Sequence, residues 1–189
     1  PLSYNWQLGA VGDALILCGD VDDRHPNIVS CFLNITEFIE FLSQAQQQVL
    51  FFSGNLSFIN LKSHDKLILE VLEDLIKRNV QVKTLSRVDV VSKENVETLL
   101  SLNFKHGKEQ IDIRHREQPI RGLIIDNNIC RLKEIKEPTG RTRELTTTMF
   151  LHYTINDKEW VAWLSRLFWR MFNNSIIARK RLEELKKIH

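Results

Sequence analysis

Three clusters of polar residues, each directly after an apolar run, are the places where this sequence could do chemistry. They are Ser53-Gly54-Asn55, Ser86-Arg87-Val88-Asp89 and Arg114-His115-Arg116-Glu117. If the runs are neighbouring parallel strands, their carboxyl ends lie at one rim of a sheet, where open α/β sheets bind ligands. Cations that meet there could hold a phosphate or a carboxylate. Polar residues also follow strands simply because loops are solvated, and this interpretation stays open.

The familiar catalytic motifs are missing from the sequence. It contains no H-E-x-x-H metal motif, no G-x-S-x-G nucleophile motif and no glycine-rich phosphate loop. His115 is a single histidine after a strand, and such a residue is more often structural than a base. We therefore expect that the protein binds no metal or cofactor and is not an enzyme. A phosphodiesterase or nuclease that uses His115 as a base is the alternative.

The elements that must position these clusters follow from the hydrophobic pattern. Short apolar runs predict three strands, at residues 49–52, 80–85 and 110–113. Amphipathic helices are expected between them, with Ser63 and Ser92 as their N-caps. Strands that alternate with helices favour right-handed crossovers and a parallel sheet. The sequence therefore predicts an α/β fold with the polar clusters at one rim.

The rest of the chain predicts strands and helices that extend this core. After Pro119, a turn at Asp126-Asn127-Asn128 and an alternating stretch at 129–135 indicate a hairpin, which we expect at the edge of the sheet. Further predicted elements are a strand at 14–18, an apolar run at 28–33, a helix capped by Thr36, a strand at 146–155, a helix capped by Asn156 or Asp157, and a final helix at 176–189. We expect three segments: 1–48 packing on the core, the core at 49–155, and a helical appendage at 156–189.

The long helix after residue 157 carries apolar residues around more than half of its circumference. One face must pack on the sheet, and the remainder must meet either the final helix or a partner subunit. We expect a homodimer whose interface includes Trp160, Trp163, Leu167, Phe168 and Phe172. Whether the strands near the N-terminus pair with their own sheet or with a partner's is left open.

The composition excludes several classes of protein. The chain has 189 residues, 43% of them hydrophobic, and a formal net charge of +2. Its three cysteines form no C-x-x-C pair, no apolar run reaches the roughly 20 residues that span a bilayer, and no signal peptide is evident. We expect a cytoplasmic protein without a membrane partner. Residues 114–143 hold eight Lys or Arg against four acids, so a nucleic-acid-binding module is another alternative.

Residues 49–137 resemble one half of a phospholipase D-like domain. The signature of that superfamily is H-x-K-x-x-x-x-D, and the stretch in register here runs from Pro119 to Asp126. Asp126 keeps the acid, Arg121 keeps a cation, and Pro119 stands where the nucleophilic histidine should be. The resemblance implies a layered α/β fold with a largely parallel sheet and helices on both faces. It also implies that the covalent chemistry is lost, because proline has no nucleophile.

Residues 49–58, residues 113–125 and the tryptophan-rich helix also resemble the effector domains of archaeal TrmB-family transcription regulators. That resemblance implies a non-catalytic domain that senses an effector, dimerises, and contacts DNA through a segment upstream of Pro1. A small anionic metabolite is the expected ligand, and a stand-alone interaction scaffold is the alternative. The predicted ligand site consists of Ser53, Asn55, Arg87, His115, Arg121 and Asp126.

Overall fold

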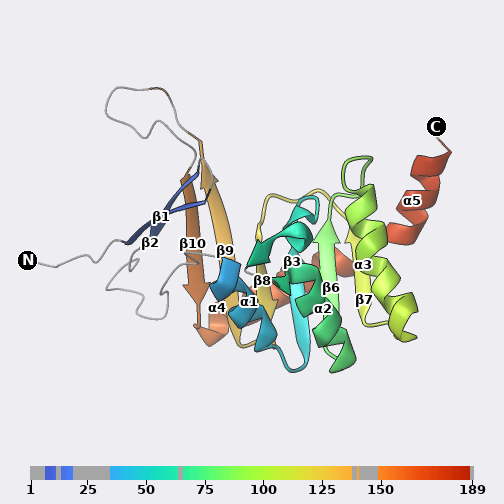
Figure 1. Cartoon of the computed structure of the whole chain (residues 1–189), viewed down its shortest axis with the longest axis horizontal. Coiled ribbons are helices and arrows are strands. Elements are labelled where there is room, and N and C mark those ends of the chain that lie inside the picture. The colour runs from blue at the N-terminus through green and yellow to red at the C-terminus, as the bar shows by residue number, and fades with distance from the viewer. Residues whose placement is uncertain are drawn as a thin grey trace, which may run out of the picture.

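The computed structural model describes residues 7–11, 14–18, 35–63, 66–137, 140 and 149–187. The helices are α1 (Ile35–Ser43), α2 (Ile68–Lys77), α3 (Lys93–His106), α4 (Lys158–Asn173) and α5 (Ala178–Lys186), with a short 3-10 helix η1 (Ser57–Asn60). The strands are β1 (Gln7–Val11), β2 (Ala14–Cys18), β3 (Gln48–Phe52), β4 (Lys62–Ser63), β5 (Lys66–Leu67), β6 (Gln81–Ser86), β7 (Ile111–His115), β8 (Gly122–Ile125), β9 (Ile129–Lys136), β10 (Met149–Ile155) and β11 (Ile176–Ile177). Nine of them form one sheet, in the order β1-β2-β10-β9-β8-β3-β6-β7-β11 (Figure 1).

The centre of the sheet contains the three parallel strands that the sequence predicts. β3 pairs with β6 and β6 pairs with β7, with Val49 opposite Val82 and Val82 opposite Ile111. Helices α2 and α3 make the two crossovers. β3 is apolar and buried from Val49 to Phe52, without the alternation of a half-exposed strand, because both of its faces are covered. β7 alternates between buried Ile111 and Ile113 and the more exposed Asp112 and Arg114.

The prediction of a largely parallel sheet is matched only in part, because the sheet is mixed. Only β3 with β6, β6 with β7, and β2 with β10 run parallel among the described strands. Strand β8 runs antiparallel to β3, and β8, β9 and β10 follow one another as an antiparallel meander. The predicted edge hairpin β8–β9 therefore lies in the middle of the sheet. Its turn is as expected, since Asp126 and Asn127 have φ values of 51° and 53°.

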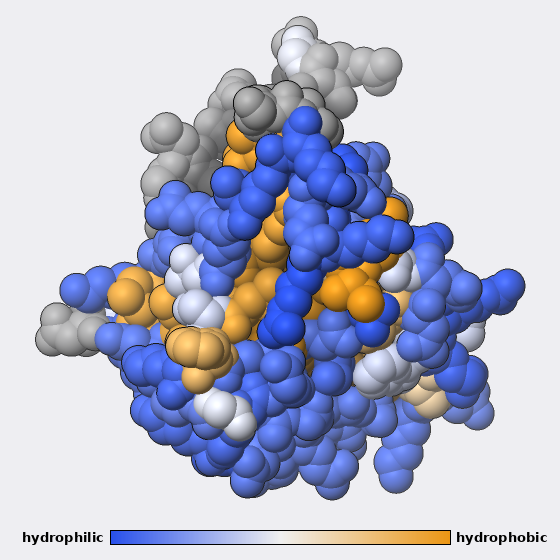
Figure 2. Space-filling model, turned by 90° about the vertical axis from the view of Figure 1, so that its right-hand side faces the viewer, coloured by the Kyte–Doolittle hydropathy of each residue, from blue (hydrophilic) through white to orange (hydrophobic). Residues whose placement is uncertain are grey.

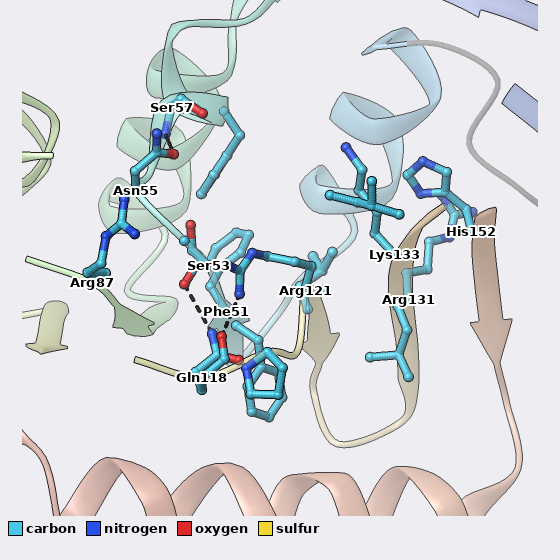
Figure 3. A pocket seen from close by; sticks show the side chains of 18 of the residues that line it. Phe51, Ser53, Asn55, Ser57, Arg87, Gln118, Arg121, Arg131, Lys133 and His152 are labelled. Carbon is cyan, nitrogen blue, oxygen red and sulfur yellow. Dashed lines mark hydrogen bonds between the residues drawn. The ribbon is translucent and has the colours of Figure 1, made fainter. Parts of the chain in front are cut away.

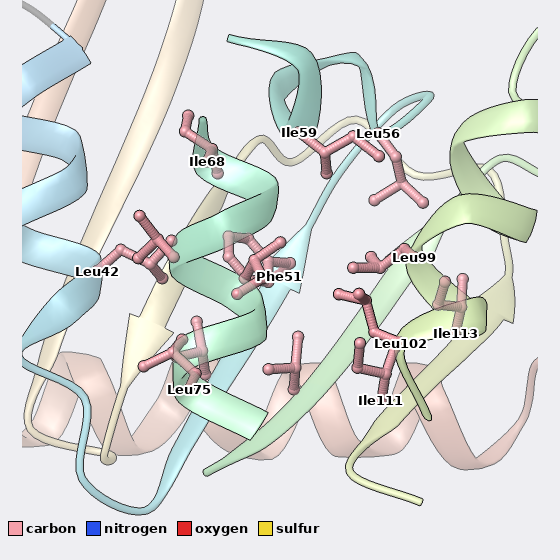
Figure 4. Close-up of a cluster of buried hydrophobic side chains, with 14 of the residues drawn as sticks. Leu42, Phe51, Leu56, Ile59, Ile68, Leu75, Leu99, Leu102, Ile111 and Ile113 are labelled. Carbon is pink, nitrogen blue, oxygen red and sulfur yellow. The ribbon is translucent and has the colours of Figure 1, made fainter. Parts of the chain in front are cut away.

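Helices cover both faces of the sheet, as predicted. On one face α1, α2, α3 and α5 enclose a core that includes Leu42, Phe51 and Leu99 (Figure 4). On the other face α4 packs over Phe52, and the rings of Phe52 and Phe168 meet edge to face with centroids 5.2 Å apart. Adjacent residues Phe51 and Phe52 enter opposite cores because side chains alternate along a strand.

Several helix boundaries differ from their predictions. Ser63 lies in β4, and α2 begins only at Ile68, where the Glu70 carboxylate accepts a hydrogen bond from the backbone N–H of Leu67. Thr36 lies inside α1 rather than before it. The final helix is shorter than expected because Ile176 and Ile177 form a strand along the edge of β7.

Two N-caps agree with their predictions. Ser92 occupies the N-cap position of α3, although its hydroxyl makes no capping hydrogen bond and instead accepts one from the N–H of Asp89. Asp157 caps α4 by accepting hydrogen bonds from Glu159 N and Trp160 N at 3.0 Å. A carboxylate at this position also interacts favourably with the helix dipole.

The N-terminal strand pairs within its own chain, because Leu15 of β2 lies opposite Met149 of β10. The apolar run at 28–33 lies outside the described residues. At the other end of the sheet, the face seen in Figure 2 is mostly hydrophilic and interrupted by smaller apolar patches. No helix in the described ranges is both long and apolar enough to cross a membrane.

Candidate functional site

A cavity of about 910 Å³ opens at the end of the sheet where β3 and β6 finish and β8 begins (Figure 3). Its wall comes from the loops after β3, β6 and β7, from β8, β9 and β10, and from α1 and η1. It is thus the rim at which the sequence predicts a ligand site. The cavity also extends across β9 and β10, which the prediction did not include.

The loops after β3 and β6 are fixed to each other by backbone hydrogen bonds. Ser53 N donates to Leu85 O at 2.9 Å, and Arg87 N donates to Gly54 O at 2.8 Å. The half-exposed Arg87 side chain forms an ion pair with Asp89, with 2.6 Å between Nε and Oδ2. Ser53 and Arg87 therefore occupy defined positions at the left of Figure 3.

Arg121, directly before β8, occupies the centre of the cavity. Its Nη1 donates to the carbonyls of Gln118 at 2.7 Å and Ile120 at 2.9 Å. A Cβ atom on Gly54 would lie 3.2 Å from Nε and from Nη2 of Arg121, so the glycine permits this close approach. Burial and the charge of Arg87 lower the pKa of Arg121. An arginine nevertheless remains charged at neutral pH.

Gln118 brings a buried hydrogen-bond acceptor to the cavity wall. Its side chain is only 9% exposed, and its Nε2 donates to Ser53 O at 3.0 Å. Its Oε1 is buried and has no hydrogen-bond partner within the described part of the chain. Buried acceptors nearly always have a partner. A ligand with a hydroxyl or N–H group could supply one.

Strands β9 and β10 contribute Arg131, Lys133 and His152. Lys133 and His152 lie directly opposite each other in the antiparallel ladder, so their side chains share one face of the sheet. Burial lowers the pKa of Lys133, and the charge of Arg121 lowers it further. Burial, Lys133 and Arg131 lower the pKa of His152 to about 4, so this histidine is neutral at pH 7. Burial also lowers the pKa of Arg131 to about 10.

The cavity is strongly positive. Glu117 is the one carboxylate among its described lining residues, which include five cations: Arg87, Arg116, Arg121, Arg131 and Lys133. Positive charges of this density favour an anion, and arginine can bind phosphate or carboxylate with two hydrogen bonds. No cluster of His, Cys, Asp and Glu suited to a metal ion occurs in the described ranges.

Four of the six predicted ligand residues line this cavity: Ser53, Asn55, Arg87 and Arg121. The prediction missed Gln118, Arg131, Lys133 and His152. Arg131 and Lys133 alternate with apolar residues and therefore share one face of a strand, a signal that the sequence does contain. At the edge of the sheet, where the hairpin is predicted, such charged side chains would face solvent.

Asp126 is a predicted ligand residue that the structure places elsewhere. Strand β8 begins opposite Phe52 and ends opposite Val49, so Asp126 lies at the far end of β3. Its carboxylate accepts hydrogen bonds of 2.8 Å from the backbone N–H groups of three successive residues, Gln46, Gln47 and Gln48. Its role is therefore structural: it fixes the entry to β3.

His115 does not line the cavity either. Its Nδ1 accepts a hydrogen bond of 2.8 Å from the N–H of Val88, so it fixes the loop after β6. Burial and then the charge of Arg181 lower its pKa. An enzyme with His115 as its base would therefore have to act outside this cavity.

The predicted interface on α4 divides into two groups. Phe168 and Phe172 are buried in the core of their own chain, so their assignment to an interface is corrected. Their spacing places them on the face that packs on the sheet. Trp160 and Trp163 are 51% and 50% exposed, and their rings meet edge to face at 5.9 Å. Leu167 is partly buried.

Comparison with known proteins gives a result only at the level of structure. No family model and no curated protein matches the sequence. One similar structure is that of TrmBL2, an archaeal chromatin protein described with a novel mode of DNA binding. It matches with a TM-score of 0.52 and 16% sequence identity, and the match covers 75% of this chain and 48% of that chain. The chain thus spans about half the length of TrmBL2.

A phospholipase D family member, Nuc from Salmonella typhimurium, also matches with a TM-score of 0.52. Its identity to this chain is 12%, and the match covers 76% of this chain and 89% of that chain. At such identities the similarity concerns the fold alone. The chain has a phospholipase D-like α/β fold, which confirms the predicted fold class apart from the mixed sheet.

Proposed function

We propose that this chain is the effector-sensing and dimerisation domain of a transcription regulator, and that it binds a small anionic metabolite without catalysis. The observation that supports the ligand class is the cavity itself, where five cations accompany a single carboxylate among the described lining residues. Its volume is in the range of cavities that enclose small molecules. The cavity combines this charge with apolar walls, so it would select an organic anion over a simple ion.

Pro119 is the reason that we expect no catalysis. This residue lines the cavity at the register position of the phospholipase D nucleophile, and it has no group that could attack phosphorus. His152 is the histidine that lines the cavity, and it lies on β10, away from that register. We expect no hydrolysis of a phosphodiester such as bis(4-nitrophenyl) phosphate. Turnover that His152→Ala abolishes would overturn this part of the proposal.

The regulatory role is supported by the fold and by α4. TrmBL2 shares the fold and is described as binding DNA, and we propose that DNA is contacted through a segment upstream of Pro1. The half-exposed pair Trp160 and Trp163 would form part of a dimer interface, where tryptophan is enriched. Light scattering after size exclusion should give a dimer that Trp160→Ser with Trp163→Ser converts to a monomer. A wild-type monomer would refute the dimer.

Ligand binding is tested by thermal shift and calorimetry with inorganic phosphate and short alkyl phosphates. A ligand at 100 times its Kd should stabilise the fold by about 2.7 kcal/mol. Arg121→Gln and Arg87→Gln should each weaken this effect, because each removes a cation from the cavity. Arg166→Gln, on the exposed face of α4, is the matched control. Equal binding by all four proteins, or no binding by the wild type, would refute the proposal.

A further inference from the structure

The cations of the cavity are spread along it rather than gathered at one point. Arg87 follows β6, Arg121 directly precedes β8, and Lys133 lies on β9. Figure 3 shows them in this order across the cavity, with Arg121 in the middle. From β6 to β9 the sheet order is β6-β3-β8-β9, which is three strand spacings, or about 14 Å at the backbone.

Arg87, at one end of the cavity, and Arg121, in its middle, are held in place by their own hydrogen bonds. Nε of Arg87 is held by Asp89 at 2.6 Å, and Nη1 of Arg121 is held by two backbone carbonyls. The backbone N of Lys133 donates to Arg121 O at 2.7 Å, so Lys133 lies opposite Arg121 on the neighbouring strand. A single phosphate accepts hydrogen bonds only from donors within about 3 Å of its oxygens. We therefore expect a phosphate bound to the anchored Arg87 guanidinium to leave the end of the cavity at Lys133 to a second anionic group, since their strands are about 14 Å apart.

The positive charge is nevertheless continuous between the two ends. Burial is the larger cause that lowers the pKa of Arg121, and the charge of Arg87 is the second. The pKa of Lys133 is lowered in the same way, first by burial and then by the charge of Arg121. At the far end, Lys133 and Arg131 lower the pKa of His152 in the same way. Each cation thus repels the next along the cavity. An anion bound at one end relieves the repulsion there and leaves the other end positive.

Apolar side chains line the wall that faces these cations. Phe51 and Phe58 stack with centroids 5.0 Å apart, and Phe38 meets Phe58 edge to face at 6.2 Å. All three line the cavity, together with Leu61, which is 45% exposed. The cavity therefore offers an apolar surface alongside its row of charges.

We propose that the ligand is an elongated organic molecule with two separate anionic groups, one bound between Arg87 and Arg121 and the other beside Lys133 and His152. Its connecting part lies against the apolar wall of Phe38, Phe51 and Phe58. This inference rests on the proposed function, since it specifies the kind of anion that the same cavity binds. It distinguishes the ligand from a monophosphate or a simple carboxylate.

The test uses a series of α,ω-alkanediol bisphosphates of increasing length, each compared by calorimetry with the alkyl monophosphate of equal length. The alkyl part is the same in both, so any difference reports the second anionic group. We expect one range of lengths to bind about tenfold more tightly than the matched monophosphate, because both ends are then engaged at once. Shorter bisphosphates should show no such gain.

Substitutions at the two ends separate the two groups. Arg87→Gln and Lys133→Gln should each lower the affinity for the optimal bisphosphate about tenfold, to that of the monophosphate. Each should lower monophosphate affinity by only about twofold, because a single anion can still use the intact end. Lys133→Arg keeps the charge and should restore bisphosphate binding, and Arg166→Gln should change nothing.

The outcomes distinguish this inference from the proposed function. If neither kind of phosphate binds, the proposed function itself fails. If both kinds bind equally at every length, the cavity binds one anionic group and only the present inference fails. If each end substitution weakens the monophosphate as much as the bisphosphate, the cations converge on one point, which also overturns the inference.

Discussion

Asp126 allows a direct test of whether a residue that the sequence predicts as a ligand contact binds ligand or fixes the fold. Its carboxylate accepts three hydrogen bonds from the backbone N–H groups before β3, at the end of the sheet opposite the cavity. Replacement by alanine removes all three. Replacement by asparagine keeps one carbonyl oxygen, and asparagine also tolerates the positive φ of 51° at this position.

The expected loss of stability follows from these contacts. Hydrogen bonds to a charged group contribute about 1.5–3 kcal/mol each, but water can replace the two exposed ones, so we assign about 3 kcal/mol to the three together. Alanine in the left-handed region adds about 1 kcal/mol of strain. Asp126→Ala should therefore lower the free energy of unfolding by about 4 kcal/mol, and Asp126→Asn by about half as much.

Urea denaturation followed by circular dichroism measures this loss. The midpoint should fall while the slope stays constant, because the area exposed on unfolding is unchanged. Folded Asp126→Asn should bind alkyl phosphates with wild-type affinity. An Asp126→Ala protein as stable as the wild type would refute the structural role, and so would a stable Asp126→Asn protein that no longer binds phosphate.

Three further predictions concern the cavity and the core. The pKa of His152 is lowered to about 4, so below about pH 6.5 the unfolded chain binds a proton that the folded chain does not. The free energy of unfolding should therefore fall by about 2 kcal/mol from pH 7.5 to pH 5, and by less in His152→Asn. Urea denaturation at both pH values measures this difference. Gly54→Ala places a Cβ 3.2 Å from the Arg121 guanidinium and should weaken phosphate binding about fivefold in calorimetry. Burial raises the pKa of Cys130 to about 12, so iodoacetamide should label this thiol only in urea, as peptide mass spectrometry would show.

Specific results would contradict these three predictions. The same loss of stability on acidification in His152→Asn as in the wild type would assign the pH dependence to other groups. Undiminished phosphate binding by Gly54→Ala would mean that Arg121 can move aside without loss. Rapid labelling of Cys130 in the native protein would show that the core around α4 opens readily.

The order of elements in the central sheet was predictable because burial leaves a local signal. Residues 49–52 form an uninterrupted apolar run, as a strand covered on both faces requires, and the helices that follow show 3.6-residue periodicity. The place of the β8–β9 hairpin was not predictable in this way. It depends on the pairing of Leu50 with Ile124, across more than 70 residues, and periodicity contains no information about such partners.

In the candidate site, too, the cavity residues that the sequence predicts are those with a local signal, and the residues missed are those brought together by strand pairing. Ser53, Asn55 and Arg87 were predictable because they directly follow strands. Lys133 and His152 were missed because they meet only through the pairing of β9 with β10. The interface prediction failed at Phe168 and Phe172 for a related reason: a helix that is apolar on most sides does not reveal which side faces the sheet.

The pairing of β2 with β10 has a consequence for the order of assembly. Leu15 and Met149 are neighbours in the sheet but lie far apart in the chain, so their contact closes a very long loop. The parallel unit β3–β6–β7 has shorter connections and should form first. During synthesis the β1–β2 hairpin leaves the ribosome early, yet its partner strand is made only after most of the chain. Until then its pairing edge is exposed and prone to association with other chains.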